Sequence, residues 1–156
     1  MDSLYNSLVQ VHSVGRWILL LLLVVAIFKS MTAGSRPYTR GDAKTGLFLT
    51  IVADLMLLVG AYLWVAGDKG YKLIEGSGGM GGVMKNDVAR FFAVEHLAGM
   101  LIAIILIHIG KAQGKKSMPD RSKHRRSFIF YLLGLLIILA TIPWPFREVG
   151  LGRGWL

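Results

Sequence analysis

The chain has 156 residues, of which 54% are hydrophobic and 17% are charged, and its mean hydropathy is +0.55. This balance is typical of a membrane protein and not of a soluble globular domain. Cysteine is absent, which excludes disulfides, thiolate metal sites and cysteine catalysis. The net charge is +9. In a chain this apolar, basic loops are expected to set membrane orientation and to contact anionic lipid headgroups, and we therefore expect no nucleic-acid binding.

Four stretches are long and apolar enough to cross the ~30 Å hydrocarbon core of a bilayer. They predict a single domain over residues 1–156, with an all-α fold that is an integral membrane four-helix up-down bundle. The first stretch has no small-residue cleavage pattern after it, so we expect it to remain as a membrane anchor. The expected spans are residues 4–30, 43–66, 87–112 and 122–142.

Local signals mark where these spans begin and end. Asn86 or Asp87 is a suitable N-cap for the third span, and Pro143 and Pro145 in "IPWPF" stop the fourth. The glycine-rich linker between the second and third spans is expected to be irregular. Its "GSGGMGG" run lacks the preceding strand and the following Lys-Ser/Thr of a phosphate-binding loop.

The basic residues are unevenly shared between the two sides of this bundle, and the richer side is expected to be cytoplasmic. Both termini and the glycine-rich linker would then face the outer, periplasmic side, where Trp144 and Trp155 suit an aromatic belt. The richer side holds Lys29, Arg36, Arg40, Lys44, Lys111, Lys115, Lys116, Arg121, Lys123, Arg125 and Arg126. The other side holds Lys69, Lys72, Lys85, Arg90, Arg147 and Arg153, and Arg16 lies inside the first span.

Two histidines on different spans are expected at the same depth. At ~1.5 Å per residue, His96 lies ~14 Å from the Asp87 end of its helix, and His12 lies at a similar depth if its helix begins near Ser3. Neutral imidazole is a good axial ligand for haem iron, and an apolar bundle shields the porphyrin. His12 and His96 are therefore our candidate axial ligands to a haem b, held between diagonal helices.

A second pair of histidines lies nearer the basic side. His108 is near the end of the third span and His124 near the start of the fourth, so their heights could match. His96 and His108 are ~18 Å apart along the helix but ~120° apart in direction. Because that angle is poor for one shared face, and because His124 lies in a solvated basic run, one haem is favoured over two.

Three charged residues also lie inside the expected spans: Arg16, Asp54 and Glu95. One interpretation is a buried ion-pair cluster, Arg16 with Asp54 or Glu95, that fixes the helix register. The other is a set of proton-carrying or quinol-binding groups beside a redox centre. Either carboxylate could also orient a ligand imidazole through its second ring nitrogen.

A non-haem metal site is the rival chemistry. His12, His96, Glu95 and Asp54 form a possible ligand set for iron, manganese or zinc. Against it, the Glu-x-x-His spacing of di-iron bundles does not occur in the sequence. The neighbours Glu95 and His96 also point ~100° apart on a regular helix, so both cannot easily reach one ion.

The strings "HSVGRW", "RFFAVEH", "HIG", "KHRR" and "IPWPFRE", in this order on four spans, resemble a group of small bacterial membrane proteins labelled cytochrome b-like. The resemblance covers nearly the whole chain. It implies a four-helix protein of the bacterial inner (plasma) membrane with b-type haem. On it, His12 and His96 match the intramembrane histidines, and His108 and His124 the cytoplasmic-side pair. The 12-residue spacing of His96 and His108 departs from the 13 or 14 of better-known four-helix cytochromes b.

The leading hypothesis is a b-type haem protein that transfers electrons, with quinol or an outer-side redox protein as candidate partner. It would be a haem-dependent membrane oxidoreductase or a relay, alone or as an oligomer or complex subunit in contact with lipid. Lys85 and Arg90 are expected to pair with haem propionates at the outer surface. The alternatives are a non-redox accessory or assembly subunit of a membrane complex, and a small proton-coupled transporter, which the lack of an inverted repeat disfavours.

Overall fold

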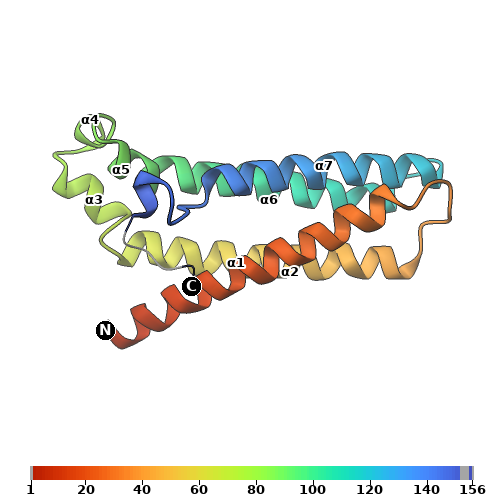
Figure 1. Ribbon diagram of the computed structural model, residues 1–156, viewed down its shortest axis with the longest axis horizontal. Coiled ribbons are helices and arrows are strands. Elements are labelled where there is room, and N and C mark those ends of the chain that lie inside the picture. The colour runs from red at the N-terminus through yellow and green to blue at the C-terminus, as the bar shows by residue number, and fades with distance from the viewer. Residues whose placement is uncertain (1, 152–154, 156) are drawn as a thin grey trace.

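The computed structural model describes residues 2–151 and 155, and within them the protein is all-helical (Figure 1). Four helices are long and apolar enough to cross a membrane, as the hydropathy predicted. The predicted fold class is confirmed, and the chain is a multi-pass membrane protein. Its long helices are α1 (Asp2–Met31), α2 (Arg40–Ala66), α6 (His96–Ala112) and α7 (Asp120–Thr141).

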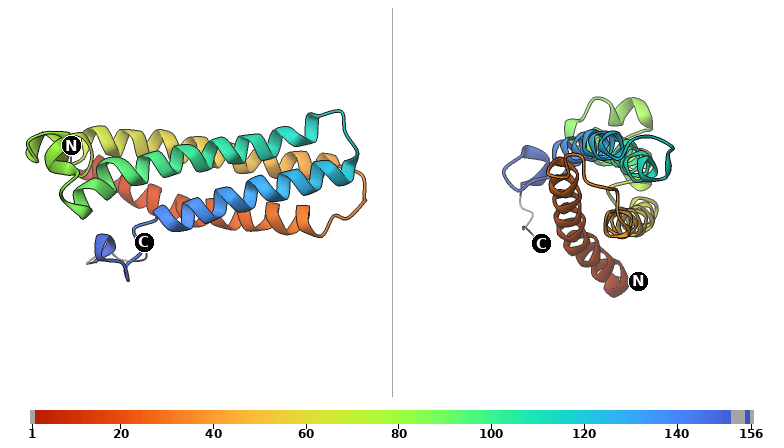
Figure 2. Two further views of the ribbon diagram at one scale, coloured as in Figure 1. Left: turned by 90° about the horizontal axis from the view of Figure 1, so that it is seen from above. Right: turned by 90° about the vertical axis from the view of Figure 1, so that its right-hand side faces the viewer.

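The four long helices form an up-down bundle. Helix α1 packs against α2 and α7, and α6 also packs against α2 and α7, so α1 and α6 are diagonal, as expected. The α1–α2 and α6–α7 connections lie together at one end, which we call the loop end (Figure 2). The N-terminus and the linker between α2 and α6 lie at the other, which we call the terminal end.

The third span is one continuous helical rod with a wide turn in it. It begins as α5 (Asp87–Arg90), where the Asn86 side chain accepts a hydrogen bond from the Ala89 backbone N–H at 2.9 Å, which confirms the predicted N-cap. Residues Phe91–Glu95 then form a π-helical turn, and α6 begins at His96. Such turns rotate everything that follows, and they are frequent at functional sites.

The glycine-rich linker was expected to be irregular, and this expectation is partly wrong. It contains two short helices, α3 (Tyr71–Gly76) and α4 (Met80–Val83). Gly78 and Gly79 between them have φ of 73° and 93°, a conformation that glycine adopts without strain. The turn they make brings Val83 back onto the third span, where it is fully buried against Ala89 and Ala93.

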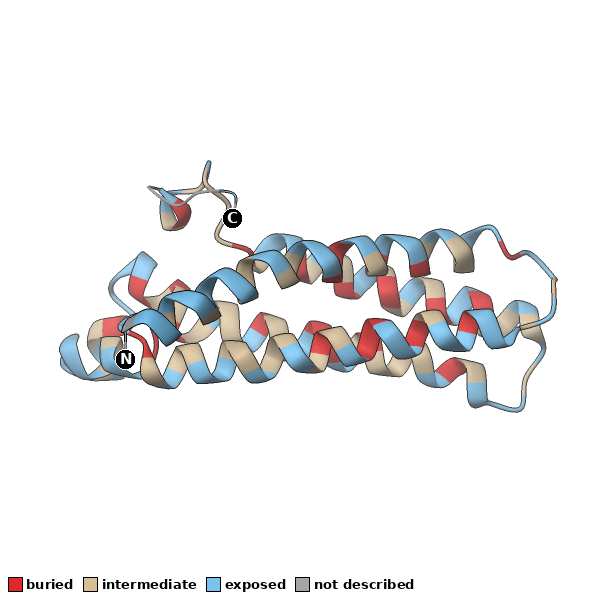
Figure 3. Cartoon of the chain, turned by 90° about the horizontal axis from the view of Figure 1, so that it is seen from below, coloured by how far each residue is buried: buried red, intermediate tan, exposed pale blue. Residues whose placement is uncertain are grey.

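The middle of the bundle is a solid apolar layer. Leu23, Leu49, Ile107 and Ile138, one from each long helix, are at most 1% exposed. Buried residues face the bundle interior and exposed ones face outward (Figure 3). Many exposed residues are large and apolar, such as Leu58, which suits a surface covered by lipid.

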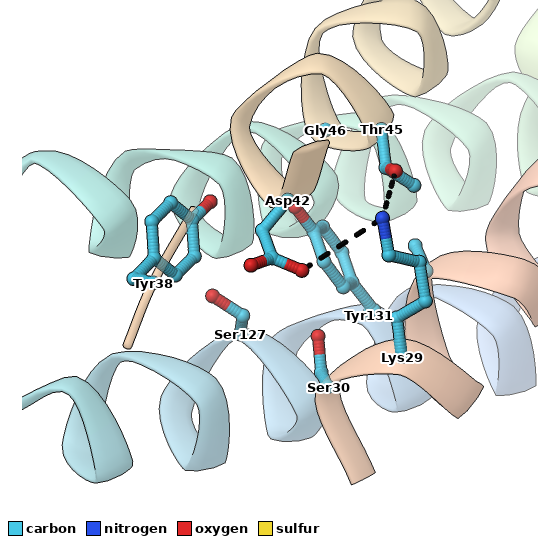
Figure 4. Close-up of a pocket in the computed structure, with 9 residues that line it drawn as sticks. Lys29, Ser30, Tyr38, Asp42, Thr45, Gly46, Ser127 and Tyr131 are labelled. Carbon is cyan, nitrogen blue, oxygen red and sulfur yellow. Dashed lines mark hydrogen bonds and ion pairs between the residues drawn. The ribbon is translucent and has the colours of Figure 1, made fainter. Parts of the chain in front are cut away.

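The loop end is held by polar contacts around Asp42 (Figure 4). The Arg36 guanidinium donates two hydrogen bonds to this carboxylate at 2.6 and 2.7 Å, and Lys29 lies 3.7 Å from it. Thr39 and Asp42 form a capping box that starts α2. The hydrogen bonds to Asp42 raise the pKa of Arg36, while burial and then the Asp42 charge raise the pKa of Tyr38. Arg36 therefore stays charged and Tyr38 neutral near pH 7.

The α6–α7 contact supplies a test of the packing. A side chain at Gly99 would collide with the Thr141 γ-methyl group, so we expect Gly99→Ala to lower the free energy of unfolding by about 1–3 kcal/mol through overpacking. Thr141→Ser removes that methyl group, so the double variant should recover part of the loss. Unfolding in mixed detergent micelles, for both single variants and the double variant, measures the coupling. A Gly99→Ala protein as stable as the parent would contradict this packing.

Candidate functional site

The terminal end of the bundle contains a partly open cavity of about 460 Å³ between the four long helices. Its size and its mostly apolar lining are typical of small-molecule and cofactor sites. Helices α1, α2 and α6 line it over several turns, whereas α7 and its exit contribute only Ile138, Ile142 and Pro143. The cavity exists because α7 ends at Thr141, level with His96, while α1 and α2 and the third span continue past it.

His12 and His96 meet in this cavity. They come from the diagonal helices α1 and α6, and their ring centroids are 6.4 Å apart with the planes at 69°. The expectation that they share one depth is confirmed. A metal bound to both rings by ~2 Å bonds needs ring centres about 6 Å apart. The observed separation is therefore compatible with one metal between them.

The orientation of His96 is fixed by the end of α7. Its Nδ1 lies 2.7 Å from the Thr141 carbonyl oxygen, which can only accept a hydrogen bond, so Nδ1 carries the proton. In an α-helix that carbonyl would accept from the residue four positions on, but this residue is Pro145, which has no N–H. In the neutral ring the lone pair is then on Nε2. A hydrogen bond to a backbone carbonyl is the usual support of a metal-bound histidine.

The neighbouring carbonyls of α7 are satisfied by side chains in the same way. The Trp144 indole donates to the Leu139 carbonyl at 2.8 Å, whose usual partner would be Pro143. The Arg147 guanidinium donates to the Ala140 carbonyl at 2.5 Å. The "IPWPFR" string thus ends the helix and supplies the donors that its last turn needs.

His12 is held differently. Its Nδ1 is buried, and no hydrogen-bond partner for it is present among residues 2–151 and 155. A buried ring nitrogen without a partner costs free energy, so a bound ligand at this position would be favourable. The ring lies over Gly60, where a β-carbon would be only 3.1 Å from Cε1, so glycine leaves the imidazole its place.

The predicted ion-pair cluster of Arg16 with Asp54 or Glu95 does not form, and each of the three residues has another partner. Arg16 donates to the Trp155 carbonyl at 2.6 Å. Asp54 bonds His108 at 2.8 Å, and Glu95 accepts from Arg90 at 2.7 Å.

The three charges lie in different places and have different partners: the C-terminal segment for Arg16, α6 for Asp54 and the same span for Glu95. Arg16 lines the cavity, Asp54 is on the outward side of the α2–α6 seam, and Glu95 is on the bundle surface. The Asp54 and His108 side chains are 51% and 43% exposed, so this pair faces lipid and not the bundle centre.

The inner histidine pair is not brought together around a common site. His108 is bonded to Asp54, whereas His124 is buried against the Tyr38 ring, with centroids 5.3 Å apart. The rival metal site is also not assembled: in the described part of the chain, no group of three His, Asp or Glu residues could hold a metal ion. Its two carboxylates are engaged elsewhere, as given above.

The residues expected to bind propionates are also placed elsewhere. Arg90 is already paired with both Glu95 and Asp87, and Lys85 is exposed on the linker and does not line the cavity. The cations that do line it are Arg16 and Lys69.

Two features of the site were not predicted: the Thr141 carbonyl and Gly60. The first has a signal in the sequence, because a proline four residues after a helix residue leaves that residue's carbonyl without its partner. No signal in the sequence indicates Gly60, because the rotation of the helices about their axes decides which residue of α2 faces His12. Comparisons of this chain with family models, with curated proteins and with solved structures found no match.

Proposed function

We propose that the protein is a b-type haem protein of the cytochrome b-like kind, in which His12 and His96 ligate one haem iron at the terminal end. The observation that carries the proposal is the pair of imidazoles 6.4 Å apart at a cavity of about 460 Å³. When bound, haem iron supplies one-electron transfer. The role of the chain is to hold the two imidazoles, to keep the site apolar and to restrict access from one side.

The two ligand histidines have different tasks in this proposal. His96 is oriented in advance, because its Nδ1–H is held by the Thr141 carbonyl and its other ring nitrogen carries the lone pair. The Nδ1 of His12 is buried without a partner, and coordination through this nitrogen would offset part of that cost. The lining by residues such as Leu57, Met100 and Ile104 supplies the apolar surroundings that a porphyrin needs.

The position of the cavity favours electron transfer on one side of the membrane. Its polar lining residues Tyr5, Asn6 and Lys69 are at the terminal end, and the apolar layer around Leu23 and Ile107 separates it from the loop end. A quinol in the membrane, or a redox protein at the terminal side, is the candidate electron donor or acceptor. The same apolar layer disfavours the transporter alternative, which would need a polar route between the two ends.

The first test is the absorption spectrum. Protein purified from haem-replete bacterial membranes should show a Soret band and, after dithionite reduction, an α-band, with about one haem per chain. His12→Ala and His96→Ala should each remove or strongly shift the bands. His108→Ala and His124→Ala are the matched controls and should leave them unchanged.

Colourless wild-type protein from such membranes would overturn the proposal and favour a non-redox accessory subunit, which a stable complex with another membrane protein would support. Bands that persist in both His12→Ala and His96→Ala would also overturn the assignment of the ligands. Loss of the bands in His108→Ala with folded protein would instead place a haem near the loop end.

The second test concerns orientation in the bacterial inner membrane. The excess of basic residues at the loop end favours a cytoplasmic loop end and an outer terminal end. Because the chain has no cysteine, single exposed cysteines can be introduced without background. A membrane-impermeant maleimide on intact spheroplasts should label Glu75→Cys, and should label Ser35→Cys only after permeabilisation. The reverse pattern would contradict the proposed topology.

A further inference from the structure

We propose that the cavity is specific for an amphiphile that carries a carboxylate, and that Arg16 is the residue that binds this carboxylate. The inference rests on the proposed function where it takes the ligand to be a porphyrin, because the two propionates of protohaem are such groups. It departs from the sequence-based expectation, which assigned this task to Lys85 and Arg90.

The charged residues that line the cavity are all cationic. Arg16 and Lys69 line it, and none of the described residues that line it is Asp or Glu. The acidic residues nearest in sequence to the lining are Asp54, Asp68 and Glu95, and their hydrogen-bond partners are His108, Lys72 and Arg90, respectively. A cavity with cations and no lining carboxylate attracts an anionic ligand in preference to a cationic or neutral one.

Arg16 is the better placed of the two cations. It lies one helical turn from His12, at i+4, so the two side chains are on the same face of α1. Its Nη2 donates to the Trp155 carbonyl at 2.6 Å, and its guanidinium carbon is 5.3 Å from the centre of the Trp17 ring. Its Nε is buried, with no hydrogen-bond partner among the described residues. Arginine has five N–H donors, so donors remain for a carboxylate.

A charged guanidinium at this position would be stabilised further by an anion. Ionisable groups inside a membrane span are costly unless they are paired, and no carboxylate of the described residues lies within ion-pair distance of Arg16. The rest of the lining is largely apolar, which excludes a small hydrated anion and favours a ligand with a large apolar body. A carboxylate on such a body would bind Arg16 with charge-assisted hydrogen bonds.

The experiment separates recognition of the carboxylate from ligation of iron. The probes are metal-free protoporphyrin, which has both propionates, and its dimethyl ester, which has none. Both are titrated by fluorescence, in one detergent, into full-length protein purified from haem-deficient cells. Comparing Arg16→Met with wild type for each probe cancels their different partition into micelles.

We expect Arg16→Met to weaken binding of protoporphyrin by about 10- to 100-fold, the effect of losing a charge-assisted hydrogen bond, and to leave binding of the ester unchanged. Arg16→Lys should retain part of the preference, and Lys85→Met, which removes an exposed cation outside the cavity, should match wild type. His96→Ala should keep the preference for the free acid, because no iron is present in either probe.

The outcomes distinguish this inference from the proposed function. Equal effects of Arg16→Met on both probes, or no effect on either, overturn the role of Arg16 even if the haem spectrum is normal. A preference for the free acid that disappears in Arg16→Met supports that role even if wild-type protein proves colourless, in which case only the haem assignment fails. Loss of the preference in Lys85→Met would place the carboxylate site on the linker and overturn the inference.

Discussion

The hydrogen bond between His96 and the Thr141 carbonyl is the contact on which the terminal end of the molecule depends. Pro143 and Pro145 end α7 and leave its last carbonyls without backbone donors. One of these carbonyls fixes the tautomer of His96, and the early end of the helix leaves the space that becomes the cavity. One short proline-containing string therefore produces both the room for a ligand and the orientation of a group that would bind it.

The bundle has three structurally distinct parts along its axis. The terminal end is hollow, the middle is a close-packed apolar layer, and the loop end is fixed by the contacts around Asp42. Stability can therefore reside in the middle and the loop end, while the terminal end keeps an unfilled volume. A chain with only four spans can in this way reserve part of its core volume for a cofactor without giving up its register.

Whether a feature could be predicted from the sequence depends on whether it is set by depth in the membrane or by the rotation of a helix about its axis. Hydropathy and the 1.5 Å rise per residue give depth, so the four spans and the shared level of His12 and His96 could be predicted. Partners across helices also need the rotation of each helix, which a single sequence does not give. Glu95 shows this: residues five apart point ~140° apart in an α-helix, and only the π-helical turn over Phe91–Glu95 brings it to Arg90.

The polar groups of the spans fall into two classes, and the difference carries the functional argument. Asp54 pairs with His108 between α2 and α6, and Glu95 pairs with Arg90 within the third span, so these groups satisfy each other without a ligand. Among the described residues, His12, Arg16 and His124 each have a buried nitrogen without a partner, and of these three only His12 and Arg16 line the cavity, from one face of α1. Unsatisfied groups one turn apart are expensive to keep in an apolar site unless something binds there. An imidazole that can ligate a metal and a guanidinium that can bind a carboxylate are together what a metalloporphyrin with propionates requires.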